Sequence, residues 1–396
     1  MTDHHGIKFT ESLTGTRAMT PAATAIIGIV AVGDEADGDL FPFNRPALIT
    51  NPRSAIGKAG ATGTLVKALS AIVDQCTAPV IVVRVRGGTG ASAGEDATEA
   101  EIEAAIAAET EANIIGGVTE ANELTGLKAL LVAQSVTGFK PRIIGVPGYD
   151  TQAVVAALLP VAKTLRAQVY AKARGETIAA QSAYRANFSD RELCLIWPDF
   201  TGWEGDAIAR ALGLRALIDQ AVGWHKSLSN YPVAGVTGID RDVTWDISGE
   251  NTDAAALNAQ QITTLIRNNG FRFWGNETCS DDVRYRFEVA ARTNAVLQDT
   301  INDNVQWAVD QPLTPGLIKD VLEGINAEFD RLKVSGRIMG AQAYWDDEIN
   351  SASALSSGKA RIRYKFTPVA PLESLGIEPE ITDEFYADFA QQLERL

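Results

Sequence analysis

Residues 79–85 read Pro-Val-Ile-Val-Val-Arg-Val, and residues 24–32 read Thr-Ala-Ile-Ile-Gly-Ile-Val-Ala-Val. Both stretches are apolar at nearly every consecutive position, a pattern that is typical of strands buried on both faces of a parallel sheet. Glu192–Trp197 (ELCLIW) repeats this pattern, and Pro198 ends it. These stretches predict the centre of a sheet whose two faces are both covered by other parts of the chain.

Segments with helical periodicity separate the strand-like segments. Shorter strands are predicted at 46–50, 142–146 and 168–171. Apolar residues recur with helical spacing in the segments between strands, at 64–74, 151–166, 178–187 and 207–222. Repeated strand–helix units imply right-handed crossovers. We therefore predict an α/β fold in which a mostly parallel sheet is flanked by helices.

The pattern changes after about residue 270. Two long helices are predicted at 284–309 and 315–334. The stretch 339–345, a Ser-rich turn region at 351–358 and an alternating strand at 361–367 follow them. This order favours a second domain of the α+β class. The predicted organisation is an N-terminal arm at 1–20, an α/β domain at 21–270, an α+β domain at 271–375 and a C-terminal arm at 376–396.

Three segments alternate in a way that assigns their side chains to opposite faces of a strand. In the N-terminal segment Gly6–Thr10, Ile7 and Phe9 share one face, and Lys8 and Thr10 share the other. In the strand 361–367, the apolar face holds Ile362, Tyr364 and Phe366, and the basic face holds Arg361, Arg363 and Lys365. In the C-terminal arm, Ile377 and Ile381 lie opposite Glu378 and Glu380, and Pro379 favours an edge position because it has no N–H to donate.

Composition excludes several classes of protein. The chain has 396 residues, 46% of them hydrophobic, and a formal charge of −15, which is ordinary for a globular protein and unfavourable for binding nucleic acid or an anionic membrane surface. Cys76, Cys194 and Cys279 are too few and too far apart for a disulfide framework or a CxxC metal site. No apolar run approaches the roughly 18 to 20 residues of a membrane span, and residues 1–15 lack the pattern of a signal peptide.

One glycine-rich segment is the best enzyme-like feature. Gly87–Gly94 (GGTGASAG) follows a buried strand and has the glycine spacing of a loop that cradles a pyrophosphate. Acidic residues crowd the segment that follows: Glu95, Asp96, Glu99, Glu101, Glu103, Glu109 and Glu111. This charge would repel a phosphate, so we interpret the segment as a surface loop. A nucleotide- or dinucleotide-binding enzyme remains the alternative.

The other candidate motifs favour a structural interpretation. Gly57-Lys58-Ala59 lacks the hydroxyl residue with which a P-loop binds magnesium, and the chain has only three histidines. Asp281-Asp282 precedes a predicted helix, so we interpret it as a cap, and Asp346-Asp347-Glu348 is interpreted as a solvated turn. No catalytic residue, metal site or cofactor is predicted.

Motifs spread along the chain resemble the tail sheath proteins of contractile-tailed phages and R-type pyocins. The resemblance rests on these stretches: IGVPG at 144–148, GLRA at 213–216, GWHK at 223–226, GVTG at 235–238, RFWGNET at 272–278, WAVD at 307–310, INA at 325–327 and FTPVAP at 366–371. Glu277 departs from the pattern, since sheath relatives often carry Arg there. Residues 87–111 match no family motif, and we interpret them as a variable loop and helix on the outside.

The resemblance implies a mechanical protein without catalytic residues. Sheath subunits polymerise helically in six-fold rings around a tail tube, and a baseplate signal triggers contraction that drives the tube through the target envelope. It further implies contacts with tube, baseplate and tail terminator proteins, and a place in the virion tail, or in a phage-tail-like particle, after assembly in the host cytoplasm. A monomeric binding module is the third function considered.

The resemblance also implies positions for the parts of the chain. The α/β domain faces outward, and the α+β domain faces the tube. Lys319, Arg331 and Lys333 on helix 315–334 are then expected to face the tube. The arms are expected to add strands to the sheet of a neighbouring subunit, with the strand 361–367 receiving them; an internal hairpin is the alternative.

Overall fold

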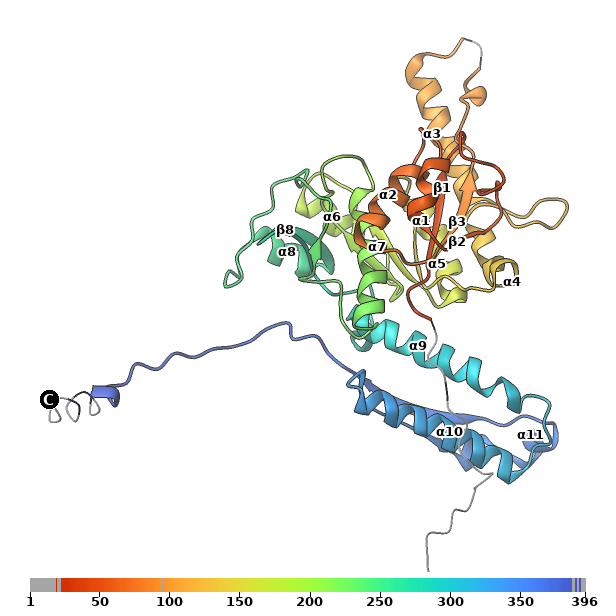
Figure 1. The fold of residues 1–396 in the computed structure, drawn as a ribbon, viewed down its shortest axis with the longest axis vertical. Helices are drawn as coiled ribbons and strands as arrows, with labels where there is room; N and C mark the ends of the chain where they lie inside the picture. The colour runs from red at the N-terminus through yellow and green to blue at the C-terminus, as the bar shows by residue number, and fades with distance from the viewer. Residues whose placement is uncertain (1–18, 20–22, 95, 387–388, 390–391, 393–396) are drawn as a thin grey trace, which may run out of the picture.

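The computed structural model describes residues 19, 23–94, 96–386, 389 and 392. It contains a large sheet-based body and a smaller unit built on two long helices, from which the C-terminal arm extends away (Figure 1). The body holds a nine-stranded sheet, and the smaller unit holds a two-stranded sheet. No helix in the described part of the chain has the length and apolar character that crossing a membrane requires.

The nine strands lie in the order β2-β3-β1-β4-β5-β6-β8-β9-β7. Their bounds are β1 Ile27–Val32, β2 Ala47–Ile49, β3 Val80–Val85, β4 Ile143–Gly145, β5 Gln168–Lys172, β6 Leu193–Ile196, β7 Pro232–Val233, β8 Ile262–Arg267 and β9 Phe271–Trp274. The six strands from β3 to β8 in this order pair in parallel, and β2, β9 and β7 pair antiparallel at the two edges. The predicted mostly parallel sheet is confirmed.

Helices cover both faces of this sheet. They are α1 Pro52–Ala55, α2 Leu65–Gln75, α3 Glu99–Ile115, α4 Ala133–Thr137, α5 Gln152–Leu165, α6 Ile178–Arg185, α7 Asp206–Ala221 and α8 Asp253–Ala259, with 3-10 turns η1 Ile56–Lys58, η2 Ala91–Ala93 and η3 Gly126–Val132. In β1, Ile27 and Ile29 pack into the core on the α2 and α7 side, and Val30 and Val32 pack into the core on the α5 side. Burial on both sides explains why the strand sequences are continuously apolar.

The smaller unit contains the second half of the predicted pattern. Its elements are η4 Val283–Tyr285, α9 Glu288–Val305, η5 Gln306–Ala308, α10 Pro315–Val334, β10 Ile338–Trp345, η6 Asp347–Ile349, α11 Ala352–Ser356 and β11 Ile362–Pro368. The predicted helix 315–334 is confirmed residue for residue, because Thr314 caps it and Pro315 occupies its first turn. The helix predicted from 284 begins later, at Glu288, since Asp282 instead caps a short 3-10 turn.

The predicted boundary at residue 270 lies too early in the chain. The strand β9 pairs antiparallel with β8 and therefore extends the large sheet. Cys279 is buried in the core beside α5, so the chain leaves the body only after this residue. Glu277 pairs with Arg286 at 2.5 Å across the exit, which gives the acidic residue at this position its own local partner.

Candidate assembly site

The β10–β11 sheet presents an apolar face to the helices beneath it. Along β11 the side chains alternate between half-buried and exposed positions. Ile362, Tyr364 and Phe366 pack against the cluster that contains Phe329 of α10. The predicted basic face, Arg361, Arg363 and Lys365, is exposed, and Arg363 forms an ion pair with Asp346 at 2.6 Å. The two predicted faces of this strand are therefore confirmed.

The two edges of this small sheet differ. On the β10 edge, the side-chain amide of Asn326 accepts a hydrogen bond from Ala343 N at 2.8 Å and donates one to Ala343 O at 3.0 Å. Asn326 on α10 thus satisfies the same two groups that a neighbouring strand would satisfy. Within the described residues, no such partner lies on the outer edge of β11. Sequence reasoning missed this role of Asn326, because a single polar residue in a helix gives no signal of it.

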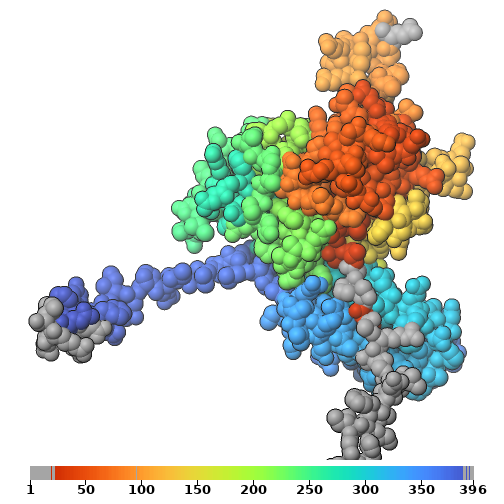
Figure 2. Space-filling view, in the orientation of Figure 1, coloured from red at the N-terminus to blue at the C-terminus, as the bar shows by residue number. Residues whose placement is uncertain are grey.

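The C-terminal arm stands clear of the rest of the molecule in this view (Figure 2). Ile377 is 80% exposed and Ile381 is fully exposed. Residues 376–382, whose alternation predicted a strand, form no strand in the isolated chain. Phe385 and Tyr386 near the end of the arm are also exposed, and their spacing with Phe389 is an aromatic signal that sequence reasoning did not use. The predicted N-terminal segment, residues 6–10, lies outside the described residues.

The predicted tube-facing side chains are all exposed on α10. Lys319 pairs with Glu323 at 3.6 Å, and Arg331 is held by Glu328 at 2.5 Å, which raises the pKa of Arg331. At about 100° of rotation per residue, Lys319 and Lys333 fall near one line along the helix, whereas Arg331 is turned by about 120°. The three cations are therefore brought to the outside of one helix, although they do not share one face.

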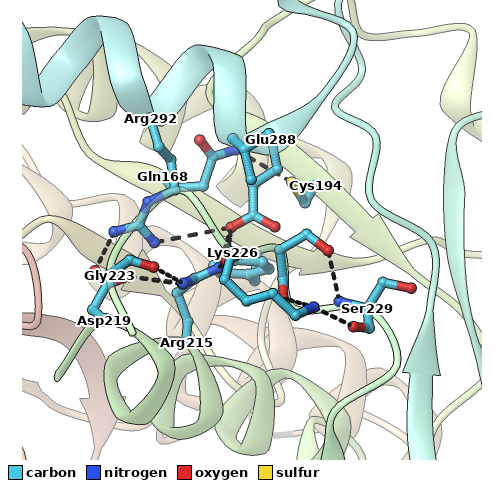
Figure 3. A network of polar contacts seen from close by, with 12 residues as sticks. Gln168, Cys194, Arg215, Asp219, Gly223, Lys226, Ser229, Glu288 and Arg292 are labelled. Atoms are coloured by element: carbon cyan, nitrogen blue, oxygen red, sulfur yellow. Dashed lines mark hydrogen bonds and ion pairs between the residues drawn. The ribbon is translucent and has the colours of Figure 1, made fainter. Parts of the chain in front are cut away.

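A buried ion network fastens α9 to the body (Figure 3). Arg215 on α7 is fully buried, and it contacts Asp219 at 2.8 Å and Glu288 of α9 at 3.1 Å. Arg292 of α9 also pairs with Asp219, and Tyr170 on β5 donates a hydrogen bond to Glu288 at 2.6 Å. Burial disfavours the charge on Arg215, but the two carboxylates outweigh this effect and raise its pKa.

A second cluster holds the middle of α9 against the body. The carboxylate of Asp299 is nearly buried and pairs with Arg142 at 2.6 Å, with Arg166 at 2.5 Å and with Lys140 at 3.9 Å. Burial is the main cause that lowers the pKa of Lys140, to about 8, and the nearby Arg142 adds to it. The two clusters attach α9, and with it the smaller unit, to the body at two points along the helix.

The glycine-rich loop does not offer its N–H groups to a phosphate. The carboxylate of Glu109 on α3 accepts hydrogen bonds from Thr89 N at 2.6 Å, Gly90 N at 3.0 Å and Ser92 N at 3.0 Å. The predicted repulsive acidic segment thus contains the anion that fills this loop. The segment projects from the body as a loop and a helix (Figure 1). In the described ranges, no group of His, Cys, Asp and Glu side chains could hold a metal ion.

Comparisons with known proteins agree along the chain. Three family models match: the tail sheath protein Gp18 domain III N-terminal region at residues 24–85, the phage tail sheath protein central domain at 122–279, and the phage tail sheath C-terminal domain at 280–382. The gap at residues 86–121 contains the segment that resembles no family motif.

Relatives and solved structures cover nearly the whole chain. The tail sheath protein of Escherichia phage P2 is 49% identical over 97% of both chains, and the major tail sheath protein of Serratia phage KSP20 is 45% identical over 98% of both. The contracted helical sheath of the anti-feeding prophage has the same fold, with a TM-score of 0.67 at 16% identity over 97% of this chain and 100% of that chain. The chain belongs to the phage tail sheath protein family.

Proposed function

We propose that the protein is a structural subunit that polymerises helically around a tail tube and contracts to drive that tube through the envelope of a target cell. The observation that carries this proposal is that one chain contains both an exposed arm with alternating side chains and a sheet with an open edge. A chain that has both parts can join to a second copy in a head-to-tail manner. Contacts of this kind generate a helical filament when the rotation between successive copies does not close them into a ring.

The architecture fits a contractile role. The buried networks along α9 make the body and the smaller unit move together, while the arm is an extended chain that can change direction. Strand addition draws its affinity from backbone hydrogen bonds, so neighbours stay linked while their bodies rotate. Energy stored in the arrangement of subunits can then be released without breaking the links between them.

The proposed partners follow from this role. They are other copies of the chain arranged in six-fold rings, the tail tube protein, the baseplate and the tail terminator, within a virion tail or a phage-tail-like particle assembled in the host cytoplasm. We place α10 towards the tube, with Lys319, Arg331 and Lys333 making weak contacts. Exposed ion pairs contribute about 0–1 kcal/mol each, which suits a surface that must slide during contraction.

Catalysis and a resident cofactor are not part of the proposal. The loop with the glycine spacing of a nucleotide site is filled by Glu109, and the family relatives are named as sheath proteins. Calorimetric titration with NAD or ATP should give no saturable heat. Tight, saturable binding of either nucleotide would favour the enzyme alternative.

Deletion of residues 376–396 tests the function directly. The deleted segment is exposed wherever the structure describes it, so the shortened chain should fold with unchanged circular dichroism. Electron microscopy should show tubes from the full chain and single particles from the shortened chain. Normal tubes from the shortened chain would refute the role of the arm. A matched control, Glu384→Gln near the end of the arm, keeps the arm itself and should still form tubes.

A further inference from the structure

A hollow of about 520 Å³ lies in the body beside α8 and the neighbouring parts of β8 and β9. Its walls come from the turn at 225–230, the loop at 245–252, the segment 274–277 and residues 371–373, which lead towards the C-terminal arm. None of its lining residues belongs to β10 or β11, so it is separate from the assembly site. Its volume is that of a typical site for a small molecule, about 300–1,000 Å³.

Two tryptophans form a fixed corner in the wall of this hollow. Trp245 begins a loop whose ends are tied together, because Asp253 N donates to Thr244 Oγ1 at 2.9 Å and Thr244 Oγ1 donates to the Asp253 carboxylate at 2.7 Å. The rings of Trp245 and Trp274 have centroids 5.3 Å apart and planes at 76° to each other. Both indoles are half-buried, so each keeps some accessible surface. The corner offers a rigid aromatic wall to an occupant.

Two buried polar atoms of the lining residues have no hydrogen-bond partner in the described part of the chain. They are Oε2 of Glu277 and Nε1 of Trp245. Glu277 is only 6% exposed, and its other oxygen, Oε1, pairs with Arg286 at 2.5 Å. A buried polar atom that lacks a partner is costly, so such atoms are rare and mark places where a partner is expected. An occupant should therefore supply a donor to Glu277 and an acceptor to Trp245.

The charges around the hollow favour a cationic occupant. The lining carboxylates are Asp246, Glu277 and Glu373. Lys226 also lines the hollow, but its ammonium group donates to the carbonyls of Ser227 at 3.1 Å and Ser229 at 3.0 Å (Figure 3). Arg286, which is bonded to Glu277, is not a lining residue. Like charges brought together in a site are unfavourable, so the lining disfavours phosphates and other anions.

We propose that this hollow binds an amino sugar. The sugar ring lies against the corner of Trp245 and Trp274, its ammonium group donates to Glu277 Oε2, and one of its hydroxyl oxygens accepts from Trp245 Nε1. A sugar ring has an apolar C–H face and a polar rim, which match an aromatic wall with polar atoms beside it. This site goes beyond the proposed function and does not depend on polymerisation.

Related ligands satisfy only part of this arrangement. A polyamine supplies the positive charge but leaves the N–H of Trp245 without an acceptor. Glucose and N-acetylglucosamine supply hydroxyl groups but no ammonium group for the carboxylate of Glu277. Hydrogen bonds to charged groups are stronger than those between neutral groups, so the amino sugar should bind best.

The test is calorimetric titration of the unassembled full-length chain with four probes: glucosamine, glucose, N-acetylglucosamine and spermidine. The titration is run at a slightly acidic pH, where the amino group of glucosamine is charged. Glucosamine should bind saturably, with a Kd about tenfold or more below that of each other probe. Equal binding of spermidine would overturn the assignment of a sugar. Equal binding of glucose or N-acetylglucosamine would overturn the contact of the ammonium group with Glu277.

Two conservative variants assign the binding to this hollow. Trp245→Phe keeps an aromatic ring without the N–H, and Glu277→Gln keeps the size of the side chain without its charge. Each should weaken glucosamine binding about tenfold, and Glu277→Gln should leave the weak binding of glucose unchanged. The matched controls Trp345→Phe and Glu176→Gln make the same changes outside the hollow and should bind as the parent chain does.

Circular dichroism checks that each variant is folded. If Glu277→Gln does not fold, Trp245→Phe and the comparison of the four probes still decide the outcome. No saturable heat with glucosamine, or unchanged glucosamine binding in folded Trp245→Phe, would refute the site.

Discussion

Replacing Arg215 by methionine should weaken the attachment of α9 to the body, because Arg215 is the fully buried cation of the ion network between them. Methionine keeps the length of the side chain and its packing, but it removes the donors to Asp219, to Glu288 and to the carbonyl of Lys226 at 2.7 Å. Two buried carboxylates then share Arg292 as their cation. Breaking a buried ion network by removing one member costs about 3–5 kcal/mol. We expect the free energy of unfolding to fall by that amount.

The assay is urea unfolding of the unassembled full-length chain, followed by tryptophan fluorescence and circular dichroism. Arg241→Met is the matched control, because Arg241 is half exposed and pairs with the exposed Glu176. Exposed pairs contribute about 0–1 kcal/mol, so the control should change little. The double variant R215M/E288Q should recover at least about 1 kcal/mol over the sum of the single effects, since one uncompensated charge is removed. A loss for R215M no larger than that of the control would refute the reasoning.

Three further predictions concern the body, the loop and α10. Gly213→Val places a side chain against α2, where a Cβ would already lie 2.9 Å from a backbone oxygen, and should cost about 1–3 kcal/mol in thermal unfolding. Hydrogen bonds, chiefly those from Ser92, lower the pKa of Glu109 from its ordinary value of 4.5 to about 2. The amides of the loop should therefore be fully protected from hydrogen exchange above pH 4.5 and should lose this protection as the pH falls towards 2. Glu109→Gln should weaken the protection at neutral pH. K319E/K333E should weaken co-sedimentation of the protein with the tail tube, and it should leave polymerisation of the protein in the absence of the tail tube unchanged. An equal loss of co-sedimentation and of polymerisation would contradict the placement of α10.

Much of the fold could be predicted because the signals were local. Helix α10 combines a capping Thr314, Pro315 in its first turn and an apolar stripe, and these fix its bounds without help from the rest of the chain. The continuous apolar runs of β1 and β3 likewise predict a sheet that is covered on both faces. The end of the body was misplaced because β9 is a short antiparallel edge strand, whose membership depends on pairing rather than on its own pattern.

The assembly site was only partly visible in the sequence, for a physical reason. The faces of 361–367 and of 376–382 follow from alternation alone. A strand exists, however, only where a second strand satisfies its backbone, and residues 376–382 meet no such strand in a single chain. The roles of Asn326 and Glu109 depend on contacts between distant elements. The acidic charge of Glu109, which suggested repulsion of a phosphate, belongs to the carboxylate that accepts the hydrogen bonds of the glycine-rich loop.

Cryo-electron microscopy of tubes assembled from the full-length chain tests the central claim most directly. The account predicts helical tubes in which residues 376–382 of one subunit form a strand along the outer edge of β11 of a second subunit. It also predicts that Asn326 stays bonded to Ala343 at the other edge. A chain that forms no tubes, or tubes in which every arm pairs only within its own subunit, would contradict the account.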